Sequence, residues 1–363
     1  MESLAELLAL TEYEVGDLGR AGGRHVVGVR PKGKVAPPCP YCGHAKTWRH
    51  GKRSRYVSHA SLGRESIDLD VTFERFRCPS CGKTHTPKLP EIGRRARISD
   101  RLKSEILDMV HYFKCAIQEA AKWIKVSWGT VWRALSWERP PIPRPCGSLD
   151  KLKNLCIDEV FFRSPMRFFT VLSDADRSTV LGVVPGKGYK PARKLLLSLP
   201  LHVRERIDTL STDFASGHKK AGYKFLPNVL VVADRFHLAR IARRAIIHSS
   251  KEERELAIPA VRELRRLLDA GGRRGLAMLA DWLSYWRKAP GIPANSPLAS
   301  LVSLVDEWQM EIEGYLETGC SNGVAEAINR KIALLRRKAC GYTNPANFIR
   351  RIFCLNPSLH PES

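Results

Sequence analysis

The stretch Lys153-Asn-Leu-Cys-Ile-Asp-Glu-Val-Phe-Phe162 sets the fold, because an apolar run typical of a buried strand carries two adjacent carboxylates at its centre, Asp158 and Glu159. A buried charge without a cation or a hydrogen-bond donor costs several kcal/mol. We therefore expect a metal ligand, a catalytic group, or a sheet end open to water. Side chains alternate along a strand, so the two acids face opposite sides. We interpret Glu159 as a structural or solvent-facing acid.

The segments that follow predict an RNase H-like sheet. After the first strand come two more strands, then helix and strand in alternation. The expected ranges are strands 167–173 and 179–184 joined by a hairpin turn, helix 191–199, strand 206–213, helix 214–224 and strand 228–234. Three antiparallel strands followed by this alternation give the strand order of an RNase H-like fold. We assign residues 151–240 and 321–355 to this core.

In such a sheet the first strand lies beside the fourth, so Asp158 and Asp213 are expected to face each other. Two Mg²⁺ about 4 Å apart, held by such aspartates, can support in-line phosphoryl transfer, and Mn²⁺ can replace them. Asp234 begins the sequence Asp-Arg-Phe-His237 after the fifth strand. It is either a ligand in place of Asp213 or the N-cap of a helix, and we favour a supporting role for Asp234 and His237.

A helical, basic segment, residues 241–320, interrupts the predicted core as an insertion. Its three tryptophans, Trp282, Trp286 and Trp308, stand at helical spacing and indicate a core more than base-stacking platforms. Beyond it, Glu326 is a solitary acid on a cationic helix. It is a candidate Mg²⁺ ligand beside DNA phosphates, or an i to i+4 partner of a neighbouring arginine. The expected DNA-binding residues on this helix are Arg330, Arg336, Arg337 and Lys338.

Upstream of the core, a stiff Pro-rich linker is expected at 139–150, preceded by a helical domain at 91–138. Ser99 and Ser127 are suitable N-caps for the first and third of three helices. The last helix carries Trp128, Thr130 and Arg133, and the pattern is typical of a helix-turn-helix with its recognition helix at the end. A plain trihelical packing unit is the alternative.

Two knuckles, Cys39-Pro-Tyr-Cys42-Gly and Cys78-Pro-Ser-Cys81-Gly, mark residues 1–90 as a zinc-ribbon domain. Four thiolates in two C-x-x-C pairs can close a tetrahedral structural Zn²⁺ site, and no thioredoxin-like pattern supports a redox role. His85 is interpreted as a surface residue. Between the knuckles, a basic segment forms either a phosphate-contacting face or a solvated loop. Its candidate DNA contacts are Arg49, Lys52, Arg53 and Arg55.

Composition agrees with a nucleic-acid partner. Sixty Lys and Arg against 37 Asp and Glu give a net charge of +23, which favours binding to a polyanion. No apolar run approaches the roughly 18 residues of a membrane span, and acidic residues occupy the N-terminal stretch where a secretion signal would be basic. We therefore expect no membrane partner and a cytoplasmic protein, associated with the nucleoid when bound to DNA.

Several of these motifs together resemble the ISL3 family of bacterial insertion-sequence transposases. They are Ile157-Asp-Glu, Asp234-Arg-Phe-His, Ser321-Asn-Gly-x-x-Glu326 and the later Gly341-Tyr-x-Asn-x-x-Asn-Phe, with the cysteine knuckles and the helix-turn-helix upstream. The resemblance extends from about Leu8 to Phe353. Ala327 replaces the glycine that usually follows the motif glutamate.

The resemblance implies a DDE transposase with a retroviral-integrase-like core and the catalytic triad Asp158, Asp213 and Glu326. In such enzymes water attacks a phosphodiester at the element's end, and the freed 3′-OH then attacks target DNA. The implied partners are double-stranded DNA, as terminal inverted repeats and as target, and a second protomer that pairs the two ends. The alternatives are an RNase H-like nuclease without strand transfer and a non-catalytic zinc-ribbon regulator.

Overall fold

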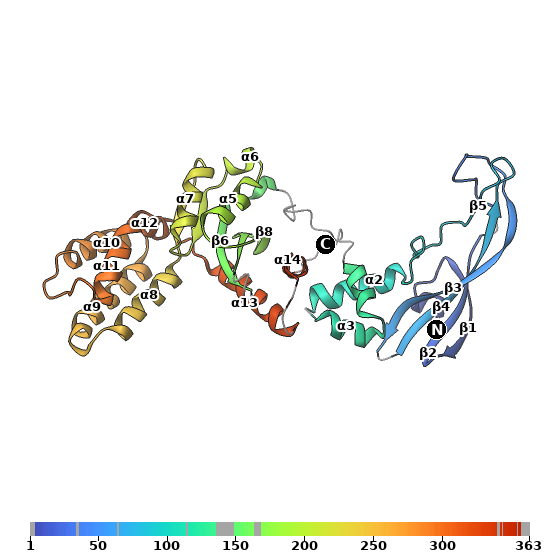
Figure 1. Cartoon of the computed structure of the whole chain (residues 1–363), viewed down its shortest axis with the longest axis horizontal. Helices are drawn as coiled ribbons and strands as arrows, with labels where there is room; N and C mark the ends of the chain where they lie inside the picture. The colour runs from blue at the N-terminus through green and yellow to red at the C-terminus, as the bar shows by residue number, and fades with distance from the viewer. Residues whose placement is uncertain are drawn as a thin grey trace. The chain divides into compact units, whose positions relative to one another are not determined.

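The computed structural model describes residues 4–33, 36–63, 65–113, 115–135, 149–162, 168–339, 342, 344–353 and 355–356. The chain divides into two compact units, Met1–Arg139 and Pro140–Ser363 (Figure 1). The expected Pro-rich linker, 139–150, lies outside the described residues as far as residue 148. None of the described helices is both long and apolar enough to cross a bilayer.

The first unit is built on a twisted sheet with the order β1-β2-β4-β3, and a short β5 pairs with β4. Its strands are β1 (Tyr13–Ala21), β2 (Arg24–Pro31), β3 (Trp48–Leu62), β4 (Glu65–Arg77) and β5 (Thr84–His85), preceded by the helix α1 (Leu4–Leu7). Strands β1 and β2 form a hairpin, whose turn uses Gly22 and Gly23 at positive φ.

The basic segment between the cysteine pairs is a strand, so its interpretation as a loop is wrong. β3 pairs antiparallel with β4 from Trp48–Arg77 to Leu62–Glu65. Its first seven residues are exposed on both faces of the hairpin, so they lack the apolar alternation that signals a strand. The second half turns Val57 into the core beside Leu69 of β4.

Three helical segments follow, as predicted: α2 (Asp100–Leu107), continued by the π-helical turn η1 (Asp108–Tyr112), then α3 (Ile117–Ile124) and α4 (Trp128–Leu135). Ser99 caps α2 by accepting from the Leu102 amide. These helices are joined to the sheet by buried polar contacts. The Nδ1 of His59 lies 3.0 Å from the Ser99 hydroxyl, and the Ser66 hydroxyl donates to the carbonyl of Ile124. Sheet and helices therefore form a single compact unit.

The second unit contains the predicted sheet, with the order β10-β9-β6-β7-β8. After η2 (Leu149–Lys151), its elements are β6 (Asn154–Phe161), β7 (Phe168–Asp174), β8 (Thr179–Pro185), α5 (Tyr189–Leu197), α6 (Leu201–Arg204), β9 (Thr209–Thr212), α7 (Ser216–Phe225) and β10 (Leu230–Ala233). The β6–β7–β8 meander is antiparallel, whereas β9 and β10 run parallel to β6. This order is that of an RNase H-like sheet, as expected. Helix α6 was not predicted.

Different helices cover the two faces of this sheet. On one face Leu155 and Ile157 of β6 pack with residues of α5 and α7. On the other, Val160 of β6 packs with α13 (Gly323–Lys338) and α14 (Pro345–Phe353). Successive side chains of β6 therefore enter two separate apolar layers, which fixes the direction of its two acids.

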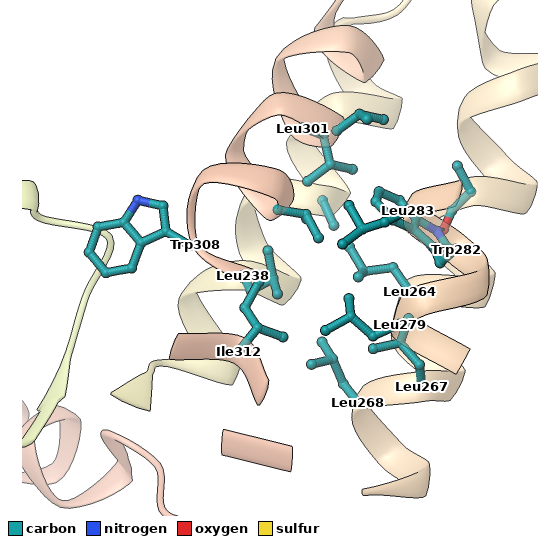
Figure 2. Close-up of a cluster of buried hydrophobic side chains, with 14 of the residues drawn as sticks. Leu238, Leu264, Leu267, Leu268, Leu279, Trp282, Leu283, Leu301, Trp308 and Ile312 are labelled. Atoms are coloured by element: carbon teal, nitrogen blue, oxygen red, sulfur yellow. The ribbon is translucent and has the colours of Figure 1, made fainter. Parts of the chain in front are cut away.

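Five helices between β10 and α13 form the predicted insertion. They are α8 (Arg235–His248), α9 (Lys251–Ala270), α10 (Gly272–Trp286), α11 (Pro297–Glu307) and α12 (Gln309–Thr318). Trp282, Trp286 and Trp308 are buried, which confirms their interpretation as core residues (Figure 2). Helix α12 joins the insertion to α7, because its fully buried Glu311 accepts hydrogen bonds from Lys219 at 2.9 Å and Tyr223 at 2.7 Å.

Candidate active site and metal centres

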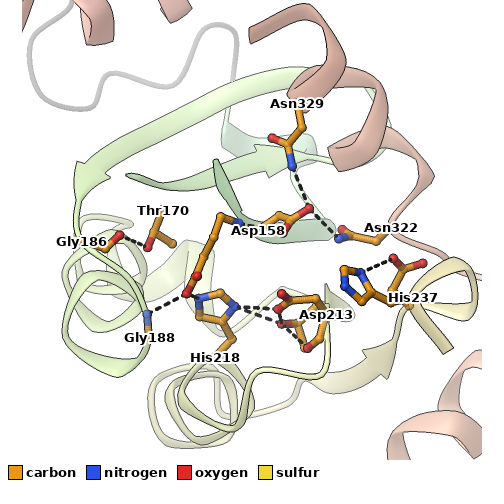
Figure 3. Close-up of polar contacts among 12 residues, drawn as sticks. Asp158, Thr170, Gly186, Gly188, Asp213, His218, His237, Asn322 and Asn329 are labelled. Atoms are coloured by element: carbon orange, nitrogen blue, oxygen red, sulfur yellow. Dashed lines mark hydrogen bonds and ion pairs between the residues drawn. The ribbon is translucent and has the colours of Figure 1, made fainter. Parts of the chain in front are cut away.

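Asp158 and Asp213 come from neighbouring strands at the same edge of the sheet (Figure 3). The parallel register pairs Ile157 of β6 with Thr212, the last residue of β9, so the next residue on each strand is an aspartate. Ile157 faces the α5 and α7 layer, and Asp158 therefore faces the α13 side. The expected adjacency of β6 and β9 is confirmed.

The Asp158 carboxyl is largely buried, and its pKa is raised above the ordinary value. Burial, followed by repulsion from the Asp213 carboxylate, raises its pKa from 3.8 to about 6. Three donors offset part of this cost: the Nδ2 of Asn329 at 2.7 Å, the Nδ2 of Asn322 at 3.5 Å, and the Glu159 backbone amide at 2.7 Å. Sequence reasoning missed both asparagines as site residues, although Asn322 stands inside the quoted Ser-Asn-Gly-x-x-Glu326 motif and Asn329 follows it by three residues.

Glu326 lies between those asparagines on α13. Asn322 is the N-cap, Glu326 is four residues on, and Asn329 three more, so all three share one helix face. Its carboxylate nevertheless accepts from the Nη2 of Arg330 at 2.7 Å, and its side chain is 50% exposed. The ion pair with Arg330 is therefore observed, and the metal-ligand role of Glu326 stays a prediction. The backbone brings Glu326 to the Asp158 face, while its carboxylate is paired with Arg330.

Glu159 points to the opposite side of β6 from Asp158, as predicted, and contacts His218, which belongs to no motif identified in the sequence. Its Oε1 accepts from the Gly188 amide at 2.9 Å and lies 3.4 Å from the Nε2 of His218. The other ring nitrogen of His218, Nδ1, lies 3.3 Å from the Oδ1 of Asp213. Burial opposes the charged imidazole, but these two carboxylates raise its pKa to about 9.

Asp234 and His237 are placed one strand farther from Asp158. Asp234 follows β10, which pairs with β9 and not with β6. Its side chain caps α8 by accepting from the Phe236 amide at 3.0 Å, and its second oxygen lies 3.5 Å from the Nδ1 of His237. Asp234 and His237 also act on the pKa of Asp158, so both belong to the same electrostatic environment.

The donor set of this site suits Mg²⁺ or Mn²⁺. Asp158 and Asp213 lie near enough for repulsion between their carboxylates, and oxygen is the preferred ligand of both ions. The side-chain oxygens of Asn322 and Asn329 are buried without a hydrogen-bond partner within the described part of the chain, so the site retains acceptors that a hydrated cation can satisfy.

The four knuckle cysteines form a second, sulfur-only centre at the end of the β3–β4 hairpin. Within the described ranges, they are the one group of three or more candidate ligands whose ligand atoms all lie within 4.8 Å of one another. The Sγ of Cys39 is 3.6 Å from that of Cys81, and Cys42 is 3.5 Å from Cys78. Sulfurs on one tetrahedral Zn²⁺ lie ~3.8 Å apart, so the cluster is compatible with zinc.

Both knuckles share one backbone geometry that presents their thiols. The amides of Gly43 and Gly82 donate to the carbonyls of Cys39 and Cys78, and both glycines have positive φ. His85 is not among the clustered residues. It is buried beside the ring of Phe76, so its interpretation as a surface residue is wrong.

Two elements of the first unit carry the expected DNA contacts. On β3, Lys52 and Arg53 are exposed, and Arg49 is exposed but pairs with Glu74 at 2.9 Å. Arg55 is half-buried, reaches the Gly93 carbonyl and lies over the Phe73 ring, and burial lowers its pKa. It therefore acts inside the unit.

On α4, Trp128 and Arg133 are exposed, and the Trp128 ring stacks on Trp132. The half-buried Thr130 shares a hydrogen bond with the Ser127 hydroxyl, so its side chain takes part in the helix cap.

The basic residues of α13 also divide into those that contact other residues of the protein and those that are exposed. Arg336 donates to the carbonyls of Phe161 and Phe162 and lies over the Phe161 ring, so it anchors α13 to the end of β6. Arg330 pairs with Glu326. Arg337 and Lys338 are exposed at the helix end.

Comparisons with known proteins agree with this geometry. The family model described as a transposase, DDE_Tnp_ISL3, matches residues 155–268 and 261–352, and the helix-turn-helix domain of transposase family ISL3 matches residues 87–136. The transposase for insertion sequence element IS1001 of Bordetella parapertussis is 23% identical over 89% of this chain and 89% of its own length. The transposase for IS1557 of Mycobacterium tuberculosis is 22% identical over 93% of this chain and 89% of its own.

Among solved structures, the catalytic core domain of BIV integrase is similar at 14% identity, covering 44% of this chain and 99% of that one, with a TM-score of 0.19. That score is too low to support an argument, and the RNase H-like assignment rests on the strand order. The DDE family model alone spans more than half of the chain, including β6, β9 and α13. The chain belongs to the ISL3 family of transposases and is a DNA transposase of the DDE type.

Proposed function

We propose that this transposase recognises the terminal inverted repeats of its insertion sequence and performs strand cleavage and strand transfer with Asp158, Asp213 and Glu326 as its catalytic acids. The observation that supports the proposal is the Ile157–Thr212 register, in which each paired residue is followed by an aspartate on one of two neighbouring strands. Helix α13 supplies the third acid, since Asn322 and Asn329, one turn to either side of Glu326, both reach the Asp158 carboxylate.

The chain's own residues would organise the reaction as follows. Asp158 and Asp213 hold divalent cations, and Asn329 fixes the orientation of the Asp158 carboxylate. Glu326 must leave Arg330 to join them, which frees a guanidinium to contact a DNA phosphate beside the site. The cations, when bound, supply Lewis acidity that activates the attacking oxygen and stabilises the leaving one.

The first unit is proposed to bind the element's ends. Cys39, Cys42, Cys78 and Cys81 would hold Zn²⁺ at the open end of the β3–β4 hairpin, away from its turn, and the exposed cations of β3 and α4 reach phosphates and base edges. The proposed DNA contacts are Lys52, Arg53, Trp128, Arg133, Arg337 and Lys338, with Arg49 and Arg330 after exchange of their carboxylate partners. Pairing two ends calls for two protomers, so we propose a homodimer on DNA.

A strand-transfer assay tests the catalytic assignment. The protein is incubated with Mg²⁺, a labelled duplex ending in the terminal inverted repeat, and a target plasmid. Wild type should join the labelled end to the plasmid. Asp158→Asn, Asp213→Asn and Glu326→Gln should each lower the joining rate on the order of a thousandfold or more, as expected when a ligand of a two-metal site is lost.

Asp234→Asn is the matched control, because it changes a nearby carboxylate that caps a helix. It should retain far more activity than Asp213→Asn. The reverse ranking would transfer the second catalytic role to Asp234. Cleavage without joining by wild type would instead identify a nuclease.

A further inference from the structure

His218 is buried at the active site in a way that packing alone does not require. It is the third residue of α7, its side chain is 0% exposed, and Figure 3 shows its ring beside Asp213. Burial of a polar ring in a protein interior is costly unless its nitrogens meet partners. Here a carboxylate lies within ion-pair distance of each nitrogen, Glu159 of Nε2 and Asp213 of Nδ1, although Nε2 makes no hydrogen bond within the described residues.

The contacts form a continuous chain from a backbone amide to a proposed catalytic acid. The Gly188 amide donates to the Oε1 of Glu159, and that oxygen lies 3.4 Å from the Nε2 of His218. Across the ring, Nδ1 lies 3.3 Å from the Oδ1 of Asp213 and 3.2 Å from the Thr212 hydroxyl. Asp213 follows the last residue of β9, so β-sheet pairing does not fix its carboxylate.

A glycine sets the position of the ring. A Cβ on Gly217 would lie 2.6 Å from the Tyr189 backbone nitrogen and about as close to Gly188, so only glycine lets the first turn of α7 rest on the start of α5. The same Gly188 segment anchors Glu159. The close approach of the two helices therefore places His218 and Glu159 against each other.

We infer that His218 is a positioning residue for Asp213, and that Glu159 in turn positions His218. A carboxylate that binds a metal is commonly oriented by such an outer partner, whose loss lowers metal affinity by roughly 10–100-fold. The inference rests on the proposed function, since it takes Asp213 as a cation ligand. It also gives Glu159 a specific role in the site.

Two substitutions of His218 distinguish its contact with Asp213 from its contact with Glu159. The amide nitrogen of asparagine can stand near the position of Nδ1, and that of glutamine near Nε2. His218→Asn therefore keeps a donor toward Asp213, whereas His218→Gln keeps one toward Glu159. Tyr223→Phe is the matched control, because it removes a hydrogen bond to buried Glu311 from the same helix.

Two measurements are made on the full chain: the Mg²⁺ concentration that gives half-maximal strand transfer, and Mn²⁺ affinity by titration calorimetry without DNA. His218→Gln should weaken both by about tenfold or more, while His218→Asn and Tyr223→Phe stay within about threefold of wild type. Melting temperature is followed in parallel to confirm that each variant is folded.

Equal effects of His218→Asn and His218→Gln, or no effect of either, would overturn the inference. So would an equal shift in Tyr223→Phe, because the effect would then follow from loosening α7. If wild type joined no DNA, the proposed function would fail, and the Mn²⁺ titration would still decide the role of His218.

Discussion

The cysteine centre and the carboxylate site are both suited to metal ions, but the fold prepares them in opposite ways. At the open end of the β3–β4 hairpin, four sulfurs already converge in matching knuckles. At the sheet edge, Asp158 and Asp213 repel each other, and Glu326 is held by Arg330. A structural metal site gains stability when all of its ligands converge on the ion. A site that must bind and release DNA instead keeps one coordination position open and some of its charge unpaired. The two centres should therefore respond oppositely to removal of their ligands.

The largest effect is expected at the cysteine centre. Cys78→Ser, or removal of zinc with a strong chelator, should unfold the open end of the β3–β4 hairpin and abolish specific binding to the terminal repeats, because the metal-binding free energy is coupled to folding. Calorimetric unfolding should show a lower transition temperature for the first unit and an unchanged transition for the second. Elemental analysis finding no zinc in active protein would contradict this assignment.

A smaller effect of opposite sign is expected at the carboxylate site. Asp158→Asn should raise the stability of the metal-free protein at pH 7.5, by about 3 kcal/mol at most, because the folded state holds this carboxylate at a pKa of about 6 against 3.8 ordinarily. Asp158 is charged in both states at pH 7.5, and that charge opposes folding. The advantage of the variant should shrink as the pH falls through 6 toward 4, where wild type takes up the proton.

Thermal denaturation at pH 7.5 and pH 5 in the presence of a chelator measures this difference, and added Mg²⁺ should reduce it. A lower melting temperature for Asp158→Asn at pH 7.5 would show that the Asn329 hydrogen bond outweighs the repulsion from Asp213.

The smallest effect concerns the arginines of α13. Arg330→Gln removes an exposed ion pair and should change the free energy of unfolding by less than about 1 kcal/mol. Arg336→Gln removes contacts with two carbonyls and the Phe161 ring, and should cost more, about 1–2 kcal/mol. Denaturant titration of both variants gives the comparison. Equal costs would mean that Arg336 does not anchor α13.

The elements that sequence patterns located correctly are those whose apolar residues enter a core on one face or on both. β6, β9 and α13 carry such patterns, and the adjacency of Asp158 and Asp213 followed from strand order. The exposed first half of β3 buries neither face, so no periodicity distinguishes it from a loop. Asn329 reaches Asp158, and His218 reaches Glu159, through contacts between elements distant in sequence, and nothing near either residue specifies that contact.

The insertion between β10 and α13 has a consequence for the order of folding. Asn329 is 171 residues from the carboxylate that it contacts, and closing so long a loop as an unstructured chain is entropically slow. Helices α8 to α12 form their own core, and α12 returns to the sheet through Glu311 and α7. Once these helices have folded, they shorten the unstructured loop that must be closed before α13 packs against β6. During synthesis on the ribosome, Asp158 and Asp213 are therefore made first, and Glu326 on α13 cannot join them until the insertion has folded.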